Sequence, residues 1–285
     1  MRAKILLLFI LIFSFSLTSC EIINPEEEIP SYVRVESISL VTDSTTQGSA
    51  SHRITDVWLY VDNQPLGVYE MPVSIPVLEE GTHAISVRAG IIVNGIASTR
   101  VYYPFYAFYN DTIQLTRTSI TTVSPVVNYF SETVFALKES FNGPGYDIIS
   151  TAASDTNYFI VNDTINSFEG AAGAAYLDAS HLVFECEPDD SLQLPTNNPV
   201  YMELNYKSNT DFSVGLHAVT SLQTYNISVL SIRATAEWKK IYINLTEGIA
   251  LYPTALGFKP YIRMERNGAV GDAQLFFDNI KVVHF

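Results

Sequence analysis

The sequence predicts an all-β protein, and three observations support this prediction. From Val33 to the end of the chain, Val, Ile, Thr, Tyr and Phe dominate, and these residue types are enriched in strands. Apolar and polar residues alternate with a period of two, and clusters of Gly, Pro, Asn and Asp separate the alternating segments. No helical periodicity extends beyond about ten residues, the length that a helix assignment needs.

The chain begins with a short basic and apolar segment. Two basic residues lie within the first four positions, an apolar run follows over 5–17, and Leu17-Thr18-Ser19-Cys20 ends it. The run has the length of a signal peptide and is too short to span a bilayer. This order resembles the lipobox of bacterial lipoproteins. The resemblance implies that residues 1–19 are a lipoprotein signal peptide and that Cys20 is acylated, with chains such as palmitate anchoring the protein in a membrane.

The residues after Cys20 are acidic and contain prolines. Residues 21–30 include two prolines and four acids, which predicts an extended tether that cannot bury a core. The run 26–28 (Glu-Glu-Glu) resembles the acidic export signal that follows the lipidated Cys in Bacteroidetes surface lipoproteins, and the alternative is a solvated linker. We interpret residues 20–32 as the lipidated Cys and its tether. The resemblance implies a protein anchored in the outer membrane that faces the cell exterior.

The composition argues against a disordered protein and against a nucleic-acid-binding protein. The chain has 285 residues, a formal net charge of −14 and a pI near 4.7. With 47% hydrophobic and 16% charged residues, the part after the tether is expected to be globular and long enough for two ordinary domains. The acidic balance argues against nucleic acid as a partner, because its phosphates would be repelled.

Cysteine is sparse. Once Cys20 is acylated, Cys186 is the remaining thiol, so neither an intramolecular disulfide nor a thiolate metal site is expected. Leu182, Phe184 and Cys186 share one face of an expected strand, which predicts a buried and inert thiol.

The first domain is expected over residues 33–130. One strand face in it is apolar and consists of Val57, Leu59 and Val61, after which Asp62-Asn63 turns the chain. The order of this strand, the turn "VDNQPLG" and the segment "LEEGTHAISV" resembles PEGA-type and related immunoglobulin-like sandwich modules over about forty residues. That resemblance implies a spacer or an adhesive domain.

The densest aromatic run in the chain covers residues 102–109. Exposed rings there would offer a surface on which sugar rings could stack. The alternative, which we favour, is that these rings fill the sandwich core and cover an edge or the domain junction.

The second domain is expected over residues 131–285. In the segment 200–207 the even-numbered residues are apolar, which predicts a half-buried strand whose odd-numbered residues, such as Tyr201, Glu203 and Asn205, point the other way. The strand that starts at Trp238 and the final strand with Phe276-Phe277-Asp278-Asn279-Ile280 resemble carbohydrate-binding modules of the jelly-roll, or galactose-binding-like, type. The resemblance implies a jelly roll over about 150 residues and supports the fold more than it supports sugar binding.

Two carboxylates are candidates for a structural calcium site. Strict alternation places Asp278 on the inward face with Phe276, Ile280 and Val282, and a buried carboxylate is costly unless it is paired. Similar jelly rolls use a carboxylate in the last strand to hold calcium, and Glu169 is the candidate second ligand. Otherwise Asp278 accepts hydrogen bonds from a neighbouring turn. No other cofactor is expected.

Trp58 and Trp238 are the candidate residues for stacking on a sugar. Strict alternation exposes Trp238, whereas a bulge before Ile241 would bury it, and we favour burial. For Trp58, alternation gives only the face that it shares with Tyr60, which leaves its exposure open.

No sequence motif indicates an enzyme, so no catalytic residue is expected. The sequence contains no G-x-S-x-G, H-E-x-x-H, P-loop or G-x-G-x-x-G pattern, and its five histidines are scattered singly. The first hypothesis is a noncatalytic protein that binds polysaccharide or another envelope component through an aromatic platform and a shallow groove on the jelly roll. The second is a structural or assembly lipoprotein that binds envelope proteins through an exposed apolar patch. A glycoside hydrolase, with two carboxylates about 5–10 Å apart in a cleft, is a distant third.

Overall fold

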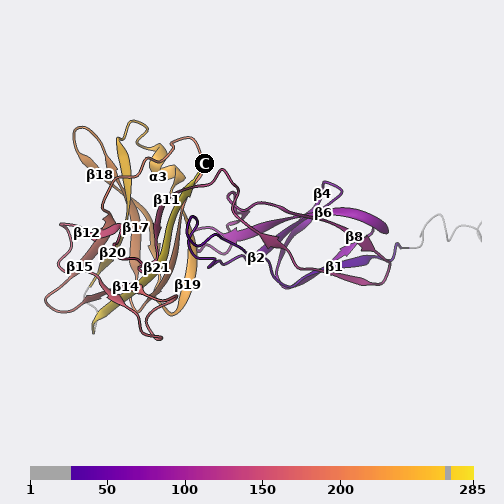
Figure 1. Cartoon of the computed structure of the whole chain (residues 1–285), viewed down its shortest axis with the longest axis horizontal. Coiled ribbons are helices and arrows are strands. Elements are labelled where there is room, and N and C mark those ends of the chain that lie inside the picture. Colours follow the sequence, from indigo (N-terminus) through magenta and orange to yellow (C-terminus); the bar gives the residue numbers. More distant parts are fainter. Residues whose placement is uncertain (1–26, 267–270) are drawn as a thin grey trace, which may run out of the picture.

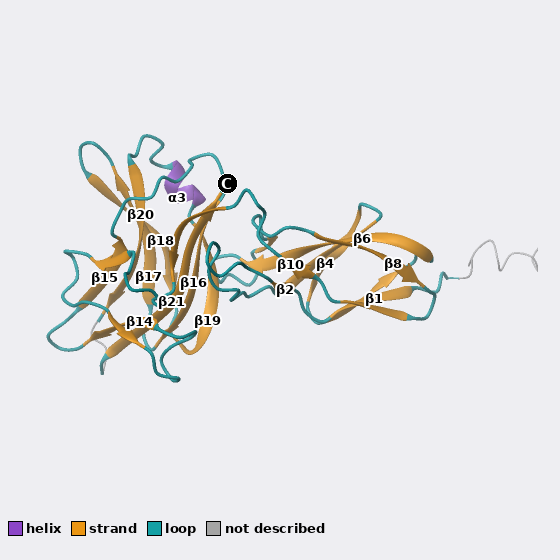
Figure 2. Ribbon diagram, in the orientation of Figure 1, coloured by secondary structure: helices purple, strands orange, loops and turns teal. Residues whose placement is uncertain are grey.

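A computed structural model describes residues 27–266 and 271–285. The predicted signal peptide (1–19), Cys20 and the first part of the tether lie outside these residues. Two β-sandwich units lie end to end (Figure 1), and strands make up both (Figure 2). The described part contains one short helix, α3 (Thr246–Ala250), so the all-β prediction is confirmed. None of its helices is long and apolar enough to cross a bilayer.

The first unit contains two main sheets. One has the strand order β5-β1-β9, the other has the order β4-β3-β6-β7 with β8 also paired to β6, and β2 pairs with β10. The strands are β1 (Ser31–Val35), β2 (Ser39–Leu40), β3 (Asp56–Val61), β4 (Gln64–Glu70), β5 (Val73–Val77), β6 (Gly81–Ile92), β7 (Arg100–Tyr102), β8 (Tyr109–Leu115), β9 (Ile120–Val123) and β10 (Val126–Val127).

Local sequence explains how β3 and β4 form a hairpin in this unit. Val57, Leu59 and Val61 of β3 are buried in the core, as their alternation predicted. Asp62 and Asn63 follow with φ angles of 46° and 65°. A tight two-residue hairpin turn requires this left-handed backbone, and Asp and Asn tolerate it better than most residues.

The second unit is a sandwich of two antiparallel sheets. We call β13-β14-β21-β16-β19, with β11 also paired to β21, the junction sheet, and β12-β15-β20-β17-β18 the outer sheet. The strands are β11 (Val134–Glu139), β12 (Ile148–Ser150), β13 (Phe159–Val161), β14 (Ala172–Leu177), β15 (Val183–Pro188), β16 (Val200–Ser208), β17 (Phe212–Val219), β18 (Thr224–Ile232), β19 (Thr235–Asn244), β20 (Gly257–Glu265) and β21 (Ala273–His284). One hydrophobic cluster lies between the sheets.

The first unit packs on the junction sheet. Tyr201, Tyr242 and Val283 of this sheet belong to the same hydrophobic cluster as the core of the first unit. Val93, just after β6, forms a β-bridge with Tyr242. The backbone N–H of Asn94 donates a hydrogen bond of 2.8 Å to the carbonyl of Tyr242. The two units therefore share apolar contacts and backbone hydrogen bonds.

This packing changes the environment of β16. The prediction of a half-buried strand was wrong, because Tyr201, Glu203 and Asn205 are 6%, 0% and 1% exposed. Alternation identifies the polar face of a strand, but it does not reveal that another part of the chain covers that face.

β21 changes its alternation at Asn279. This residue has a φ of 49°, and the register against β16 shifts between Asp278 and Lys281. Phe277 before the shift and Ile280 after it both reach the core between the sheets. Asp278 therefore lies on the opposite face from Ile280, and its predicted place beside Ile280 was wrong because the irregularity interrupts the alternation.

Candidate functional site

A buried carboxylate, that of Glu203, lies on the face of the junction sheet that the first unit covers. Glu203 on β16 is fully buried and accepts hydrogen bonds from the hydroxyls of Tyr103 (2.9 Å) and Tyr129 (2.7 Å). Its other oxygen lies 2.9 Å from Lys240 Nζ. Desolvation raises the pKa of Glu203, but the charges of Lys240 and Lys281 and the hydrogen bonds outweigh it, so the pKa is lowered and the carboxylate stays ionised.

The aromatic run 102–109 lies at this junction. Tyr103, Phe105 and Tyr106 are at most 1% exposed, and the ring of Tyr103 meets that of Tyr201 at 5.5 Å, edge to face. Most of the run therefore fills the core and the junction, as the favoured alternative stated. Tyr102 and Phe108 remain exposed at its ends.

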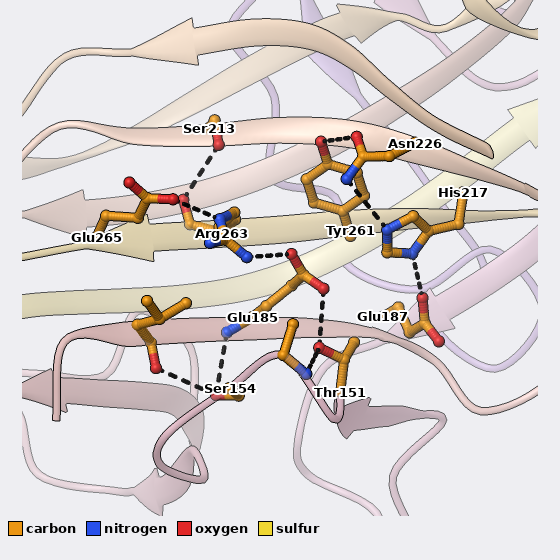
Figure 3. Close-up of polar contacts among 12 residues, drawn as sticks. Thr151, Ser154, Glu185, Glu187, Ser213, His217, Asn226, Tyr261, Arg263 and Glu265 are labelled. Carbon is orange, nitrogen blue, oxygen red and sulfur yellow. Dashed lines mark hydrogen bonds and ion pairs between the residues drawn. The ribbon is translucent and has the colours of Figure 1, made fainter. Parts of the chain in front are cut away.

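The outer sheet turns one face away from the first unit (Figure 1), and the side chains on this face are polar. Alternate residues such as Phe184, Leu216 and Ile262 point into the core. Their neighbours point outward, and Figure 3 shows side chains from four strands linked across the face. The outward set includes Glu185 and Glu187 of β15, His217 of β17, Asn226 of β18, and Lys259, Tyr261 and Arg263 of β20.

Arg263 links one end of this face. Its Nη1 donates to Glu185 Oε2 at 2.8 Å and its Nε donates to Glu265 Oε1 at 2.7 Å. Thr151 Oγ1 donates to the other oxygen of Glu185 at 2.8 Å (Figure 3). The guanidinium and the buried carboxylate are therefore held in fixed positions across β15 and β20.

Glu187 contacts two side chains at the other end of this polar face. It lies 2.7 Å from His217 Nδ1 and 3.3 Å from Lys259 Nζ. Desolvation raises the pKa of Glu187, but the hydrogen bond with His217 and the charge of Lys259 outweigh it, so the pKa is lowered. A glycosidase acid needs a carboxyl that keeps its proton, which requires a raised pKa, so Glu187 is unsuited to that role.

Tyr261 forms the floor between the two ends. A Cβ at Gly215 would lie 2.2 Å from the Tyr261 ring, so only glycine lets the ring lie close against β17. The ring stacks on His217 with centroids 4.6 Å apart, and its hydroxyl donates to Asn226 Oδ1 at 2.9 Å. Tyr261 is only 4% exposed. The face thus presents polar groups above a covered ring, rather than the aromatic platform that was expected on the jelly roll.

The charges of this face nearly cancel, because the carboxylates of Glu185, Glu187 and Glu265 lie beside the cations of Lys259 and Arg263. Glu185 pairs with Arg263, and Glu187 pairs with Lys259 and contacts His217. The side chains of His217, Lys259 and Arg263 are between 16% and 26% exposed, and Asn226 is more exposed still. Such an array offers fixed donors and acceptors without a large net charge, which suits a neutral ligand rich in hydroxyls.

Trp238 lies elsewhere, at the edge of the junction sheet. The pairing of β16 with β19 is irregular just before Lys239, as the expected bulge requires. The ring is nevertheless half-buried rather than fully buried. It lies 5.5 Å from the ring of Phe168, and together with Arg53 it lines a hollow.

Trp58 lies in the first unit, on β3. It is half-buried, and its ring meets Tyr102 edge to face at 5.6 Å. Next to it, the guanidinium of Arg88 lies over the rings of Tyr60 (4.5 Å), Tyr102 (5.2 Å) and Phe108 (4.2 Å). The two tryptophans thus belong to different units, and their role in ligand binding stays a prediction.

Glu169 and Asp278 do come together. The backbone N–H of Glu169 donates to Asp278 Oδ2 at 3.2 Å, and Asn279 Nδ2 donates to Glu169 Oε2 at 3.2 Å. Asp278 is fully buried, and this burial, with the nearby charge of Glu169, raises its pKa to about 7. Among the described residues, no third His, Cys, Asp or Glu completes a metal cluster. The calcium site stays a prediction, and amide, hydroxyl or backbone oxygens would have to supply its other ligands.

Comparison with known proteins gives structural neighbours only. No protein-family model and none of the curated proteins matches the sequence. Among solved structures, the chain is similar to the C-terminal family 22 carbohydrate-binding module of Clostridium thermocellum Xyn10B (11% identity, TM-score 0.35, 52% of this chain and 92% of that chain). It is also similar to a family 29 carbohydrate-binding module complexed with mannohexaose (12%, 0.33, 54% and 92%). A third is the family 30 module of the C. thermocellum cellulase Cel9D-Cel44B (17%, 0.34, 52% and 92%). Because these TM-scores are low, we base the proposed function on the residues of the outer sheet.

Proposed function

We propose that the protein is a noncatalytic, lipid-anchored protein of the cell envelope that binds a neutral polysaccharide on the open face of its outer sheet. The observation that supports this function is the polar array on β15, β17, β18 and β20. Its charges are paired with one another, and its donors and acceptors are held in place by those pairs. The sugar hydroxyls would exchange hydrogen bonds with Asn226, His217 and the exposed parts of Lys259 and Arg263.

The arrangement of the units supports the anchored part of the proposal. β1 begins at Ser31, at the end of the first unit that lies far from the second unit (Figure 1). A lipid on Cys20, eleven residues before Ser31, would therefore anchor the protein in the membrane through that end of the first unit. The first unit would act as a spacer, and the outer sheet would face away from an outer membrane toward the exterior.

A panel of polysaccharides tests the proposal, with and without calcium. The protein would be the chain without its predicted signal peptide, carrying Cys20→Ser so that it is not acylated. We expect saturable binding of at least one neutral polysaccharide. Asn226→Ala should weaken this binding about fivefold, the value of one neutral hydrogen bond near 1 kcal/mol.

Asn110→Ala is the matched control, because Asn110 is an exposed asparagine on a strand of the first unit. It should leave the affinity unchanged. An absence of binding across the panel would refute the proposal and favour a lipoprotein that binds envelope proteins. Equal loss in the two variants would show that the outer sheet is not the site.

A further inference from the structure

A second hollowed region lies at the junction of the two units. Two adjoining hollows of about 430 Å³ and 230 Å³ share Arg53, Lys239 and Lys240 in their walls. The larger also includes Arg233, and the smaller includes Trp238. We call the two hollows together the junction cleft.

The junction cleft concentrates positive charge in a protein whose net charge is −14. Arg53, Arg233 and Lys239 are exposed, and none of them forms an ion pair within the part of the chain that the structure describes. No Asp or Glu lines either hollow within residues 27–266 and 271–285. The fourth cation, Lys240, is buried and already neutralised by Glu203. Three unpaired cations therefore face one cleft, which makes it attractive to an anion.

The walls of the cleft are held in place by contacts between the units. The backbone N–H of Arg53 donates to the hydroxyl of Tyr242 at 3.0 Å. The side chain of Asn94 accepts a hydrogen bond from the backbone N–H of Asn244 at 2.9 Å. Loops of the first unit and strands of the second thus form one fixed surface, so binding would require little ordering.

An aromatic wall adjoins the cations. Trp238 is half-buried, and it lines the smaller hollow together with Arg53 and Lys239. The indole therefore offers a ligand a flat apolar surface beside the cations of the cleft.

We propose that the junction cleft binds acidic saccharides. The sugar ring packs against Trp238, and its carboxylate or sulfate group is bound by Arg53, Lys239 and Arg233. Guanidinium groups suit this role because they bind two oxygens of a carboxylate, or of a tetrahedral oxyanion, with two parallel hydrogen bonds. The cleft is separate from the outer-sheet site and does not rest on the proposal of neutral polysaccharide binding.

Calorimetric titration with matched charged and neutral probes tests this proposal. One pair is trigalacturonate and its methyl ester, and the other is a sulfated dextran oligosaccharide and its unsulfated counterpart. The protein is the same Cys20→Ser chain that lacks the predicted signal peptide. We expect it to bind at least one acidic probe at least tenfold more tightly than the neutral partner, because a charge-assisted hydrogen bond is worth about 1.5–3 kcal/mol. Which acidic probe binds shows whether the recognised group is a carboxylate or a sulfate.

Variants then place the site. Arg53→Ala and Lys239→Ala should each weaken binding of the acidic probe at least tenfold, and Trp238→Phe should remove the change in tryptophan fluorescence on binding. Arg117→Ala is the matched control, because Arg117 is an exposed cation of the first unit that pairs with Glu80. It should leave the affinity within twofold, as should Asn226→Ala on the outer sheet.

Three results would overturn the proposal. These are no binding of either acidic probe, equal affinity for the acidic and neutral probes, and unchanged affinity in Arg53→Ala and Lys239→Ala. The side chains of Arg53, Lys239 and Arg117 are exposed, so the thermal unfolding midpoints of these three variants should match that of the parent chain and make the affinities comparable. Loss of neutral polysaccharide binding in Asn226→Ala tests the other site and has no bearing on this one.

Discussion

Glu203→Gln is expected to destabilise the protein strongly through the junction. The substitution keeps the shape of the side chain and an oxygen that can accept from Tyr103 and Tyr129, but it removes the charge. Lys240 is then left buried without its partner, with Lys281 nearby. At the 2.9 Å separation, Coulomb's law with an effective dielectric constant of about 20 gives roughly 6 kcal/mol of attraction, which is partly offset by desolvation. Loss of one partner of such a buried pair costs about 3–5 kcal/mol.

Urea unfolding followed by intrinsic fluorescence measures this effect. The matched control is Glu265→Gln, which removes a carboxylate that is 43% exposed and pairs with Arg263, and it should cost less than about 1 kcal/mol. The double variant Glu203→Gln, Lys240→Met removes the orphaned ammonium and should recover at least about 2 kcal/mol. A loss below about 1 kcal/mol for Glu203→Gln, or no recovery in the double variant, would refute the account of the junction.

Three further predictions concern two buried groups, Asp278 and Cys186. Asp278 has a pKa of about 7 in the folded chain against 3.8 as its ordinary value, so the folded state binds the extra proton and stability falls as pH rises through this range. Between pH 5 and 8, in EDTA, the free energy of unfolding of the parent chain should therefore fall about 2–3 kcal/mol more than that of Asp278→Asn, and parallel pH profiles would contradict this. If calcium binds at Glu169 and Asp278, added calcium should raise the unfolding midpoint of the parent chain and not that of Asp278→Asn. Cys186 is 1% exposed and burial raises the pKa of its thiol, so the Cys20→Ser chain should react with a thiol reagent such as dithionitrobenzoate only after unfolding; prompt reaction of the folded chain would show that the site opens.

The alternation of apolar and polar residues was sufficient to predict the fold class and the burial of some individual residues. The alternation of Val57, Leu59 and Val61 correctly gave the core face of β3, and Cys186 lies in the core as predicted. Glu169 and Asp278 are neighbours, although they are more than a hundred residues apart in the chain. The predictions for β3 and Cys186 succeeded because they depend on strand periodicity, whereas calcium binding by Glu169 and Asp278 stays a prediction.

The candidate sites depend on contacts between residues that are far apart in the chain, and strand periodicity does not predict such contacts. Glu203 is polar and alternates correctly, yet it is buried because the first unit covers its face. Gly215 and Tyr261 are paired only because β17 and β20 are adjacent in the outer sheet. Arg53 and Arg233 lie 180 positions apart and meet at one cleft because the two units pack together.

Hydrogen–deuterium exchange with and without a neutral polysaccharide tests the central claim most directly. The polysaccharide would be the one that the panel binds most tightly, at a concentration that saturates the protein. We predict that protection increases in β15, β17, β18 and β20, whose side chains form the open polar face, and stays constant in β3, β4 and β8 of the first unit. Protection confined to the first unit, or unchanged exchange in the outer sheet at saturation, would contradict the claim that this face is the glycan-binding site.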